Sequence, residues 1–398
     1  MLTLFLIVFI DLVGFGIVIP LLPFYGEHFA ATPAEVGLLM ATYSAAQFLA
    51  APLWGRLSDR VGRRPVLAVS LAGIAAAYMW LAYATQLWEL FAARAVAGAM
   101  AGNIAVAFAY AADITTPANR AKGMGLIGAA FGLGFIFGPA IGGVLAGPDP
   151  LQADYRSPAL AAAVLSAIAF VMTVATLPES VSPEVRERLR AMPRQSRWRQ
   201  LRRSLTQPAV LLLILLSFLA HFVFAGMETT FAMWSRRQFG WGPEQNGYVF
   251  AFIGVVSAAI QGGLIGRLAR RFGEPRLIVF GACALTVGIL LIPLSHGLPL
   301  LLTAMFVVAV GFSLMSPALN SLTSLQVHPD AHGGTLGVSR SATTLARVLG
   351  PVWAGALFFY FGKAWPFLGG GAVMVLVVAL ALRIGARVTS PASGGDQG

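Results

Sequence analysis

A few ionisable side chains stand out inside long apolar stretches of this sequence. Charged residues make up only 11% of the 398 residues, whereas 58% are hydrophobic. Within the apolar stretches stand Asp11, Arg94, Glu228 and Arg347. Ionisable groups in such surroundings commonly relay protons or contact a substrate, because burying a charge is costly. Removal from water also favours the protonated form of a carboxylate, so Asp11 and Glu228 are candidates for carrying a proton.

Glu228 has a histidine on nearly the same face of its expected helix. His221 precedes it by seven residues, which corresponds to about two turns. We expect Glu228 to recognise a cationic group or to carry a second proton. His221 is either a packing residue or part of the same proton path.

Other polar side chains in the apolar stretches are candidates for lining a cavity. They are Gln47, Asn103 and Gln261. Arg347 belongs with them, because it must either pair with an acid such as Glu228 or bind an anionic group. Arg340 lies near the expected end of the same helix, where a long basic side chain can reach the membrane surface.

Helices that cross a membrane must position these residues. A crossing helix needs about 20 apolar residues, and soluble domains carry about a quarter charged residues, far more than this chain. The continuous apolar runs are approximately 2–25, 36–55, 65–85, 87–112, 121–146, 158–177, 208–235, 245–267, 276–295, 298–320, 334–361 and 364–384. They do not alternate apolar with polar residues as barrel strands do. The sequence therefore predicts an all-α integral membrane protein with twelve transmembrane helices.

The net charge of +11 is explained by where the basic residues lie. Most of them are in the even-numbered connections between runs and near the C-terminus. The odd-numbered connections hold only Arg156, Arg236, Arg237 and Lys363. Because basic residues accumulate on the cytoplasmic side, both termini and the long central connection are expected in the cytoplasm, with the protein in the plasma (inner) membrane. We therefore expect no nucleic-acid partner.

The sequence contains an internal repeat across its longest polar stretch. The segment at 55–65 recurs 211 residues later at 266–276, and Gly138-Pro139 recurs 212 residues later as Gly350-Pro351. These offsets predict two six-helix pseudo-repeats, as in transporters whose halves rock around a site at mid-membrane. The expected parts are a bundle at 1–177, a cytoplasmic linker at 178–207, a second bundle at 208–388 and a disordered tail at 389–398.

The first copy of the repeated segment carries a family resemblance. Gly55–Arg64 reads G-R-L-S-D-R-V-G-R-R and resembles the loop G-x-L-x-D-R-x-G-R-[KR] between helices 2 and 3 of the major facilitator superfamily. Arg94 with Gly98 resembles the arginine motif in helix 4 of that superfamily. The segment D-L-V-G-F-G from Asp11, the following P-x-x-P and A-D-I-T from Ala112 are similar to tetracycline-efflux-type drug:proton antiporters.

The resemblance implies a latch on the cytoplasmic side that loosens when the two halves rock. Its residues would be Gly55, Asp59, Gly62, Arg63, Arg64 and Asp113. The two glycines are expected to allow close helix approach and a tight turn. Asp59 is expected to accept hydrogen bonds from a neighbouring helix N-terminus, and Arg63 to pair with Asp113. The alternative is a basic turn that only sets the topology.

A second motif resembles one associated with antiporters of the superfamily. It consists of Gly134, Gly138, Pro139, Gly142 and Gly143. Three of the glycines share one helical face at intervals of four residues, which lets helices pack closely, and the proline can kink the helix. The resemblance further implies that Arg94 tunes Asp11 or another proton carrier.

These features predict a proton-coupled secondary transporter that exports amphipathic drugs or metabolites by alternating access. Its partners would be protons, a small-molecule substrate and the lipid bilayer, and we expect a monomer. The alternative is a proton symporter or facilitator that imports an anionic or sugar-like solute. A membrane-embedded enzyme or receptor is disfavoured, because the sequence shows neither a reactive constellation nor a soluble signalling domain. ATP-driven transport is disfavoured by the lack of a G-x-x-x-x-G-K-[ST] loop, and the one cysteine, Cys283, allows no internal disulfide and no Cys-based metal site. We expect no cofactor and no metal.

Overall fold

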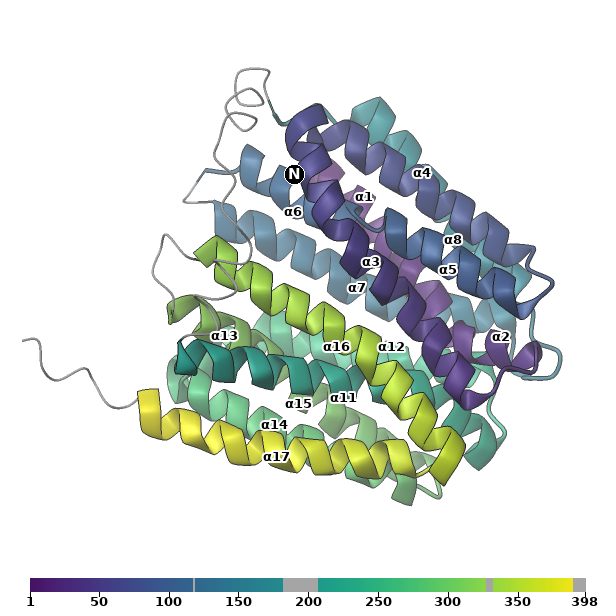
Figure 1. The fold of residues 1–398 in the computed structure, drawn as a ribbon, viewed down its shortest axis with the longest axis vertical. Coiled ribbons are helices and arrows are strands. Elements are labelled where there is room, and N and C mark those ends of the chain that lie inside the picture. Colours follow the sequence, from purple (N-terminus) through teal and green to yellow (C-terminus); the bar gives the residue numbers. More distant parts are fainter. Residues whose placement is uncertain (117–118, 182–206, 327–331, 389–398) are drawn as a thin grey trace, which may run out of the picture. The chain divides into compact units, whose positions relative to one another are not determined.

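The computed structural model describes residues 1–116, 119–181, 207–326 and 332–388 (Figure 1). Every regular element in these ranges is a helix. Among the described residues, twelve helices or runs of consecutive helices are long and apolar enough to cross a membrane. The predicted all-α fold with twelve transmembrane segments is therefore confirmed.

The first six segments are built from eight α-helices and one 3₁₀ turn. They are α1 (Leu2–Val18), η1 (Ile19–Leu21), α2 (Leu22–His28), α3 (Pro33–Val61), α4 (Arg63–Ala82), α5 (Leu87–Met100), α6 (Asn103–Ile114), α7 (Arg120–Ala146) and α8 (Arg156–Thr176). The last six segments are α11 (Pro208–Phe239), α12 (Pro243–Ala259) with the π-helical η2 (Ile260–Leu264) and α13 (Ile265–Phe272), α14 (Glu274–Leu291) with η3 (Ile292–Leu294), α15 (Leu298–Leu325), α16 (His332–Phe361) and α17 (Trp365–Val388).

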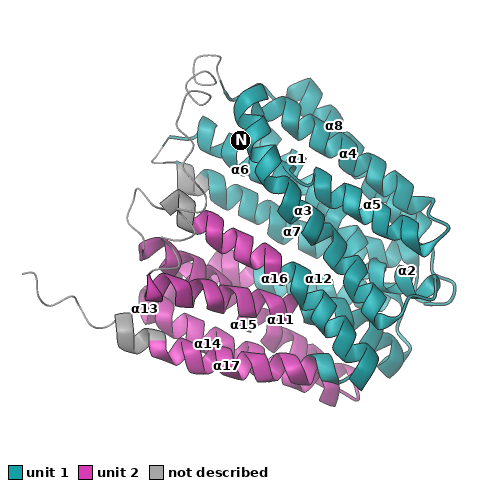
Figure 2. Cartoon of the chain, viewed as in Figure 1, with its two compact units in different colours: residues 1–194, 226–258, 347–366 teal, residues 195–225, 259–346, 367–398 magenta. Residues whose placement is uncertain are grey.

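The chain forms two compact units, coloured separately in Figure 2. Unit 1 comprises residues 1–194, 226–258 and 347–366, and unit 2 comprises residues 195–225, 259–346 and 367–398. Their boundaries fall inside α11, α12, α16 and α17, so single helices contribute to both units. The division into bundles 1–177 and 208–388 stays a prediction. Of the predicted linker, residues 182–206 lie outside the described residues, as does the tail.

Unit 1 has two ends, which we name by the chain connections they carry. The near end holds the N-terminus and the turn between α3 and α4. The far end holds the connection 29–32 between α2 and α3. The near-end turn requires glycine, because Gly62 has a φ of 121°, a value that other residues rarely adopt.

The fourth transmembrane segment is broken, which we did not predict. The predicted run 87–112 is two helices, α5 and α6, separated at residues 101–102. Carbonyl groups freed inside a membrane must find other donors. Trp54 donates from Nε1 to the Ala99 carbonyl over 2.5 Å, Gln47 donates from Nε2 to the Ala101 carbonyl over 3.3 Å, and the Ser70 hydroxyl donates to the Met100 carbonyl.

In unit 2, α14 and α15 pack backbone to backbone. A Cβ on Gly281 would lie 2.7 Å from the Gly311 carbonyl oxygen, and one on Gly288 would lie 2.7 Å from the Val308 nitrogen. Contacts this short leave no room for a side chain, as at the small-residue interfaces typical of membrane helices. Cys283 is exposed on α14 as a free thiol.

Candidate functional site

Asp11 lies in the middle of α1 and is held by two neutral donors. Asp11 is only 5% exposed. Asn103, the first residue of α6, donates from Nδ2 to Asp11 Oδ2, and the Ser166 hydroxyl of α8 donates to Asp11 Oδ1 over 3.5 Å. Within the described chain no basic side chain forms an ion pair with this carboxyl group. The helix break before Asn103 places that amide beside Asp11.

Arg94 lies on α5 with its guanidinium stacked on an aromatic ring. The residue is 2% exposed, and its guanidinium carbon lies 4.4 Å from the centre of the Tyr43 ring. Tyr43 is itself buried and packs against Phe15, with ring centres 5.1 Å apart. The structure has no ion pair between Arg94 and Asp11, so any tuning of Asp11 by Arg94 stays a prediction.

Glu228 and Arg347 are near each other without forming a closed pair. Both are half-buried, on the parts of α11 and α16 that belong to unit 1. They interact electrostatically, but no nitrogen–oxygen distance between them is within 4.0 Å. Of the two sequence alternatives for Arg347, a closed ion pair with Glu228 is therefore not formed here.

Three of the predicted residues belong to unit 2 rather than to the cluster around Asp11. The ring of His221 contacts the Ser217 carbonyl through Nδ1 at 2.8 Å and lies 5.2 Å from the Phe312 ring. Gln261, in the π-helical turn, donates from Nε2 to the Ser313 hydroxyl over 3.4 Å. Arg340 also lies in unit 2, whereas Arg347, further along α16, belongs to unit 1. Gln47, by contrast, lies at the helix break that precedes Asn103, where it donates a hydrogen bond to the Ala101 carbonyl.

The predicted contact between Arg63 and Asp113 is present at the near end of unit 1. Arg63 Nε lies 3.1 Å from Asp113 Oδ2, and Arg63 Nη1 lies 2.6 Å from Asp59 Oδ1. The same Nη1 donates to the Ser58 hydroxyl oxygen over 2.6 Å. Arg63 is 7% exposed, so its charge is neutralised inside the cluster rather than in water. Its role as a latch stays a prediction.

A residue that the sequence analysis missed caps α4 at this cluster. Glu179 accepts hydrogen bonds from the backbone nitrogens of Arg63, over 2.8 Å, and Arg64, over 3.2 Å. A carboxylate at a helix N-terminus satisfies free N–H groups and the helix dipole. The expectation that Asp59 does this is wrong, because Asp59 is engaged by the Arg63 side chain. Glu179 follows the last residues of α8, and no local pattern marked it.

Gly55 does not take part in a close helix contact, contrary to the expectation. Among the described residues no atom lies within 4 Å of the position that a Cβ would occupy at Gly55. The glycines of the second motif behave as predicted for packing. A Cβ would lie 2.8 Å from Leu12 Cβ at Gly134, 2.6 Å from Gly16 Cα at Gly138 and 2.5 Å from the Ile17 oxygen at Gly142.

The remaining members of this motif face a different helix. A Cβ on Gly143 would lie 2.9 Å from the Pro243 oxygen at the start of α12. The Pro139 oxygen would lie 2.4 Å from a Cβ on Gly247 in the same helix. The motif therefore packs α7 against α1 on one side and against α12 on the other.

The whole chain matches one family model. The model described as Major Facilitator Superfamily aligns with residues 4–351 and again with residues 262–397. The chain belongs to the major facilitator superfamily.

Individual superfamily members resemble the chain over nearly its full length. The class C tetracycline resistance protein of Escherichia coli is 34% identical over 389 residues, 96% of each chain. Multidrug resistance protein 2 of Bacillus subtilis (strain 168) is 30% identical over 380 residues, 94% of this chain and 92% of that protein. The crystal structure of the human organic anion transporter MFSD10 is 26% identical, with a TM-score of 0.70, and covers 95% of this chain and 98% of that one.

At its far end this superfamily member carries a charge cluster that the sequence analysis did not predict. We call it the far-end clasp: Glu27, Arg236 and Arg237. Each arginine Nη1 lies 2.8 Å from a Glu27 carboxylate oxygen, and the Glu27 side chain is 9% exposed. The Arg237 guanidinium carbon also lies 4.8 Å from the Phe358 ring. The clasp joins α2 to the last turns of α11, segments 209 residues apart in sequence.

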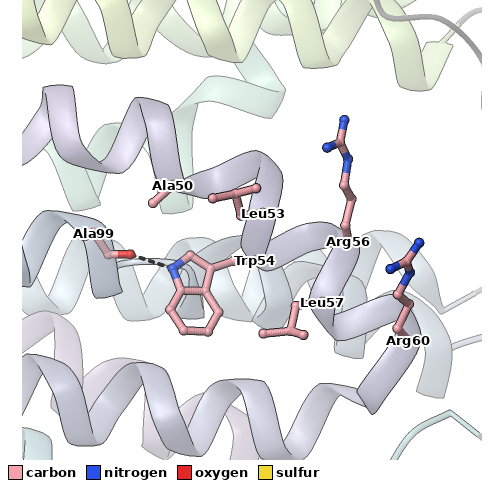
Figure 3. Close-up of a pocket in the computed structure, with 7 residues that line it drawn as sticks. All are labelled: Ala50, Leu53, Trp54, Arg56, Leu57, Arg60 and Ala99. Atoms are coloured by element: carbon pink, nitrogen blue, oxygen red, sulfur yellow. Dashed lines mark hydrogen bonds between the residues drawn. The ribbon is translucent and has the colours of Figure 1, made fainter.

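Unit 1 of this superfamily fold also contains an open groove of about 630 Å³ along α3 (Figure 3). Its lining residues are Ala50, Leu53, Trp54, Arg56, Leu57, Arg60 and Ala99. The groove adjoins the helix break, because Trp54 and Ala99 form one of its hydrogen bonds. Figure 3 draws the two arginine side chains at one end of the groove, away from Trp54. The groove is apolar with a cationic rim.

Proposed function

We propose that this protein is a proton-coupled exporter of amphipathic small molecules, working by alternating access in the plasma membrane. Its membership of the superfamily makes it a transporter. The similarity to tetracycline and multidrug resistance proteins supports export in exchange for protons. The importing alternative lacks comparable support among these relatives.

The surroundings of Asp11 are the main support for proton coupling. This residue is buried in the middle of a transmembrane helix and bonded only by the neutral groups of Asn103 and Ser166. A carboxylate fixed by a cation would stay ionised, whereas one held by neutral donors can gain or lose a proton as its access to water changes. Asp11 is thus suited to bind a proton from one side and release it on the other.

The two charge clusters suit the control of access to that carboxyl group. With the N-terminus in the cytoplasm, the Arg63 cluster lies on the cytoplasmic side and the far-end clasp on the outer side. Opening the outer side requires the ion pairs of the clasp to separate, because they join α2 to α11. The Arg63 cluster joins α3, α4 and α6, and we expect it to loosen as the halves rock. Glu228 is a second candidate for proton exchange, because it has no closed ion pair.

The role of Asp11 in proton coupling can be tested by substitution. Asp11→Asn keeps the size and polarity of the side chain but removes its ability to carry a proton, so uphill export should be lost, by about a hundredfold or more, as for an essential proton-transfer group. Everted membrane vesicles energised by respiration would be supplied with tetracycline, a lipophilic cation and an aromatic carboxylate. Substrate uptake and substrate-induced proton release from the vesicle lumen would be recorded together.

Asp149→Asn is the matched control, because Asp149 is an exposed carboxylate that only bonds the Leu151 nitrogen in a far-end connection. It should leave coupling intact. Full uphill transport by Asp11→Asn would show that Asp11 is not the obligatory proton carrier. Proton movement in the same direction as the substrate would instead support the importing symporter.

A further inference from the structure

The Arg94 guanidinium is a buried positive charge with unused hydrogen-bond donors. Its Nε and Nη1 are buried and find no acceptor in the part of the chain that the structure describes. Its guanidinium carbon lies 4.4 Å from the centre of the Tyr43 ring, a contact that provides no hydrogen-bond acceptor for these two donors. Because arginine stays protonated in proteins, the charge cannot be relieved by losing a proton. An unpaired buried charge is strongly unfavourable.

The surroundings of Arg94 supply no carboxylate to balance it. The titratable side chains that influence it are those of Tyr78, Tyr43 and a second cation, Arg347. Asp11 is occupied by Asn103 and Ser166. Glu228 interacts with Arg347 only, and without a closed pair. Neither carboxyl group pairs with Arg94, whose Nε and Nη1 have no acceptor among the described residues.

We propose that Arg94, supported by Arg347, binds an anionic group of the transported molecule, so that the substrate is an amphipathic organic anion or zwitterion. The inference rests on the proposed function, since it assigns the charge class that the exporter carries. A carboxylate or sulfonate can accept two parallel hydrogen bonds from the edge of a guanidinium, which is the strongest geometry for such a pair. The Tyr43 ring holds the guanidinium in place through a cation–π contact.

The groove along α3 has the same preference. Its walls are apolar and its only ionisable lining residues are Arg56 and Arg60. An amphipathic anion would place its apolar body against Leu53 and Trp54 and its charge near the arginines. A lipophilic cation would meet repulsion both there and at Arg94, because like charges in a low-dielectric site disfavour binding. The groove and Arg94 thus select for the same class of molecule.

The inference can be tested by binding, without transport. The purified protein in lipid nanodiscs would be titrated with three probes that share one ring system: 2-naphthoate, 2-naphthamide and 2-naphthylmethylammonium. We expect naphthoate to bind at least about tenfold more tightly than the amide, as for a buried charge-assisted pair, and the ammonium compound to bind most weakly. Arg94→Leu should abolish the preference for naphthoate over the amide, and Arg94→Lys should retain part of it.

The preference is a ratio measured on one preparation, so partial unfolding of a variant does not change it. Arg156→Leu is the matched control, because Arg156 is exposed and stacks on Tyr83 at 4.4 Å, as Arg94 does on Tyr43. It should keep the full preference. The inference is overturned if wild-type protein binds naphthoate no better than the amide, or if Arg94→Leu keeps the preference. Either result would leave proton-driven export, tested with Asp11→Asn, unaffected.

Discussion

Glu179 shows how one side chain can organise a charge cluster that belongs to three helices. Its carboxylate caps the first turn of α4, while the neighbouring Ser180 hydroxyl donates to Asp113 over 3.0 Å. Tyr110 of α6 donates to the adjacent Pro178 carbonyl over 2.8 Å. The segment after α8 therefore holds both partners of the Arg63–Asp113 pair in place. Loss of these contacts should loosen the near end.

We predict that Glu179→Ala destabilises the start of α4. Removing a capping side chain costs about 1 kcal/mol of stability, and the freed amides of Arg63 and Arg64 become open to exchange. Hydrogen–deuterium exchange of residues 63–66 should be faster, and the midpoint of thermal unfolding in detergent should fall. Glu179→Gln keeps an acceptor oxygen and should give an intermediate result. Unchanged exchange in the alanine variant would contradict the capping role.

The residues that could be identified from the sequence are charged residues inside apolar runs, which can be recognised without knowing the fold. Asp11, Arg94, Glu228 and Arg347 were found because charge is rare inside apolar runs. Glu179 and the far-end clasp were not, because they lie in polar surroundings where acids and arginines are ordinary. Their partners are also remote: Glu179 is 116 residues from Arg63. Only the packing of helices brings such pairs together.

At the scale of elements, α1 and α7 meet through their backbones. We predict that Gly138→Ala is destabilising, because its Cβ would lie 2.6 Å from Gly16 Cα and 2.7 Å from the Gly16 carbonyl carbon, neither of which can move without shifting a helix. Overpacking of this kind costs about 1–3 kcal/mol. The midpoint of thermal unfolding and the initial transport rate should both fall.

Gly128→Ala offers the control on the same helix. No described atom lies within 4 Å of its Cβ position, and alanine favours a helix over glycine by up to about 1 kcal/mol. The stability of this variant should be unchanged or higher. Equal losses in the two variants would mean that α7 tolerates no alanine for a reason other than contact with α1.

Apolar length predicted the elements well and their interruptions poorly. Twelve runs were sufficient to identify the transmembrane segments. The break at 101–102 was not predicted, because the run 87–112 is long enough for one crossing helix and contains no proline, although Gly102 and Asn103 stand at the break. Trp54, Gln47 and Ser70 on neighbouring helices satisfy the carbonyl groups at the break, so its stability depends on the packed unit.

At the scale of the molecule, the far-end clasp ties together segments from both halves of the sequence. We predict that Glu27→Gln loosens the far end more than Arg236→Gln does. Glu27→Gln removes the carboxylate and so both ion pairs of the clasp. Arg236→Gln removes one ion pair and keeps the pair between Glu27 and Arg237. A loss of about 1 kcal/mol corresponds to roughly fivefold more opening.

Hydrogen–deuterium exchange of residues 29–32 and 240–242 would measure this opening. Lys363→Gln is a suitable control, because Lys363 reaches only the Gln238 side chain amide, over 2.8 Å, and carries no described ion pair. It should leave exchange in these segments near the wild-type rate. Identical exchange in Glu27→Gln and Arg236→Gln would show that the second ion pair contributes nothing.

The internal repeat predicted two halves, whereas the compact units divide the chain differently. Unit 1 draws in 226–258 and 347–366 because backbones meet closely at its far end. A Cβ on Gly37 would lie 2.4 Å from the Pro351 oxygen, and one on Gly355 would lie 2.6 Å from the Pro33 oxygen. A sequence repeat records ancestry, while the compact units record which backbones meet.

The composition of unit 1 also sets the order of events during biosynthesis. Its first part ends at residue 194, but its last part, 347–366, is made only when nearly the whole chain has been translated. At 5–20 residues per second the intervening stretch takes roughly 10 to 30 s. During that interval the nascent first half sits in the bilayer with Gly37 lacking its partner Pro351. Lipid chains or an insertion factor must cover that surface until α16 leaves the ribosome.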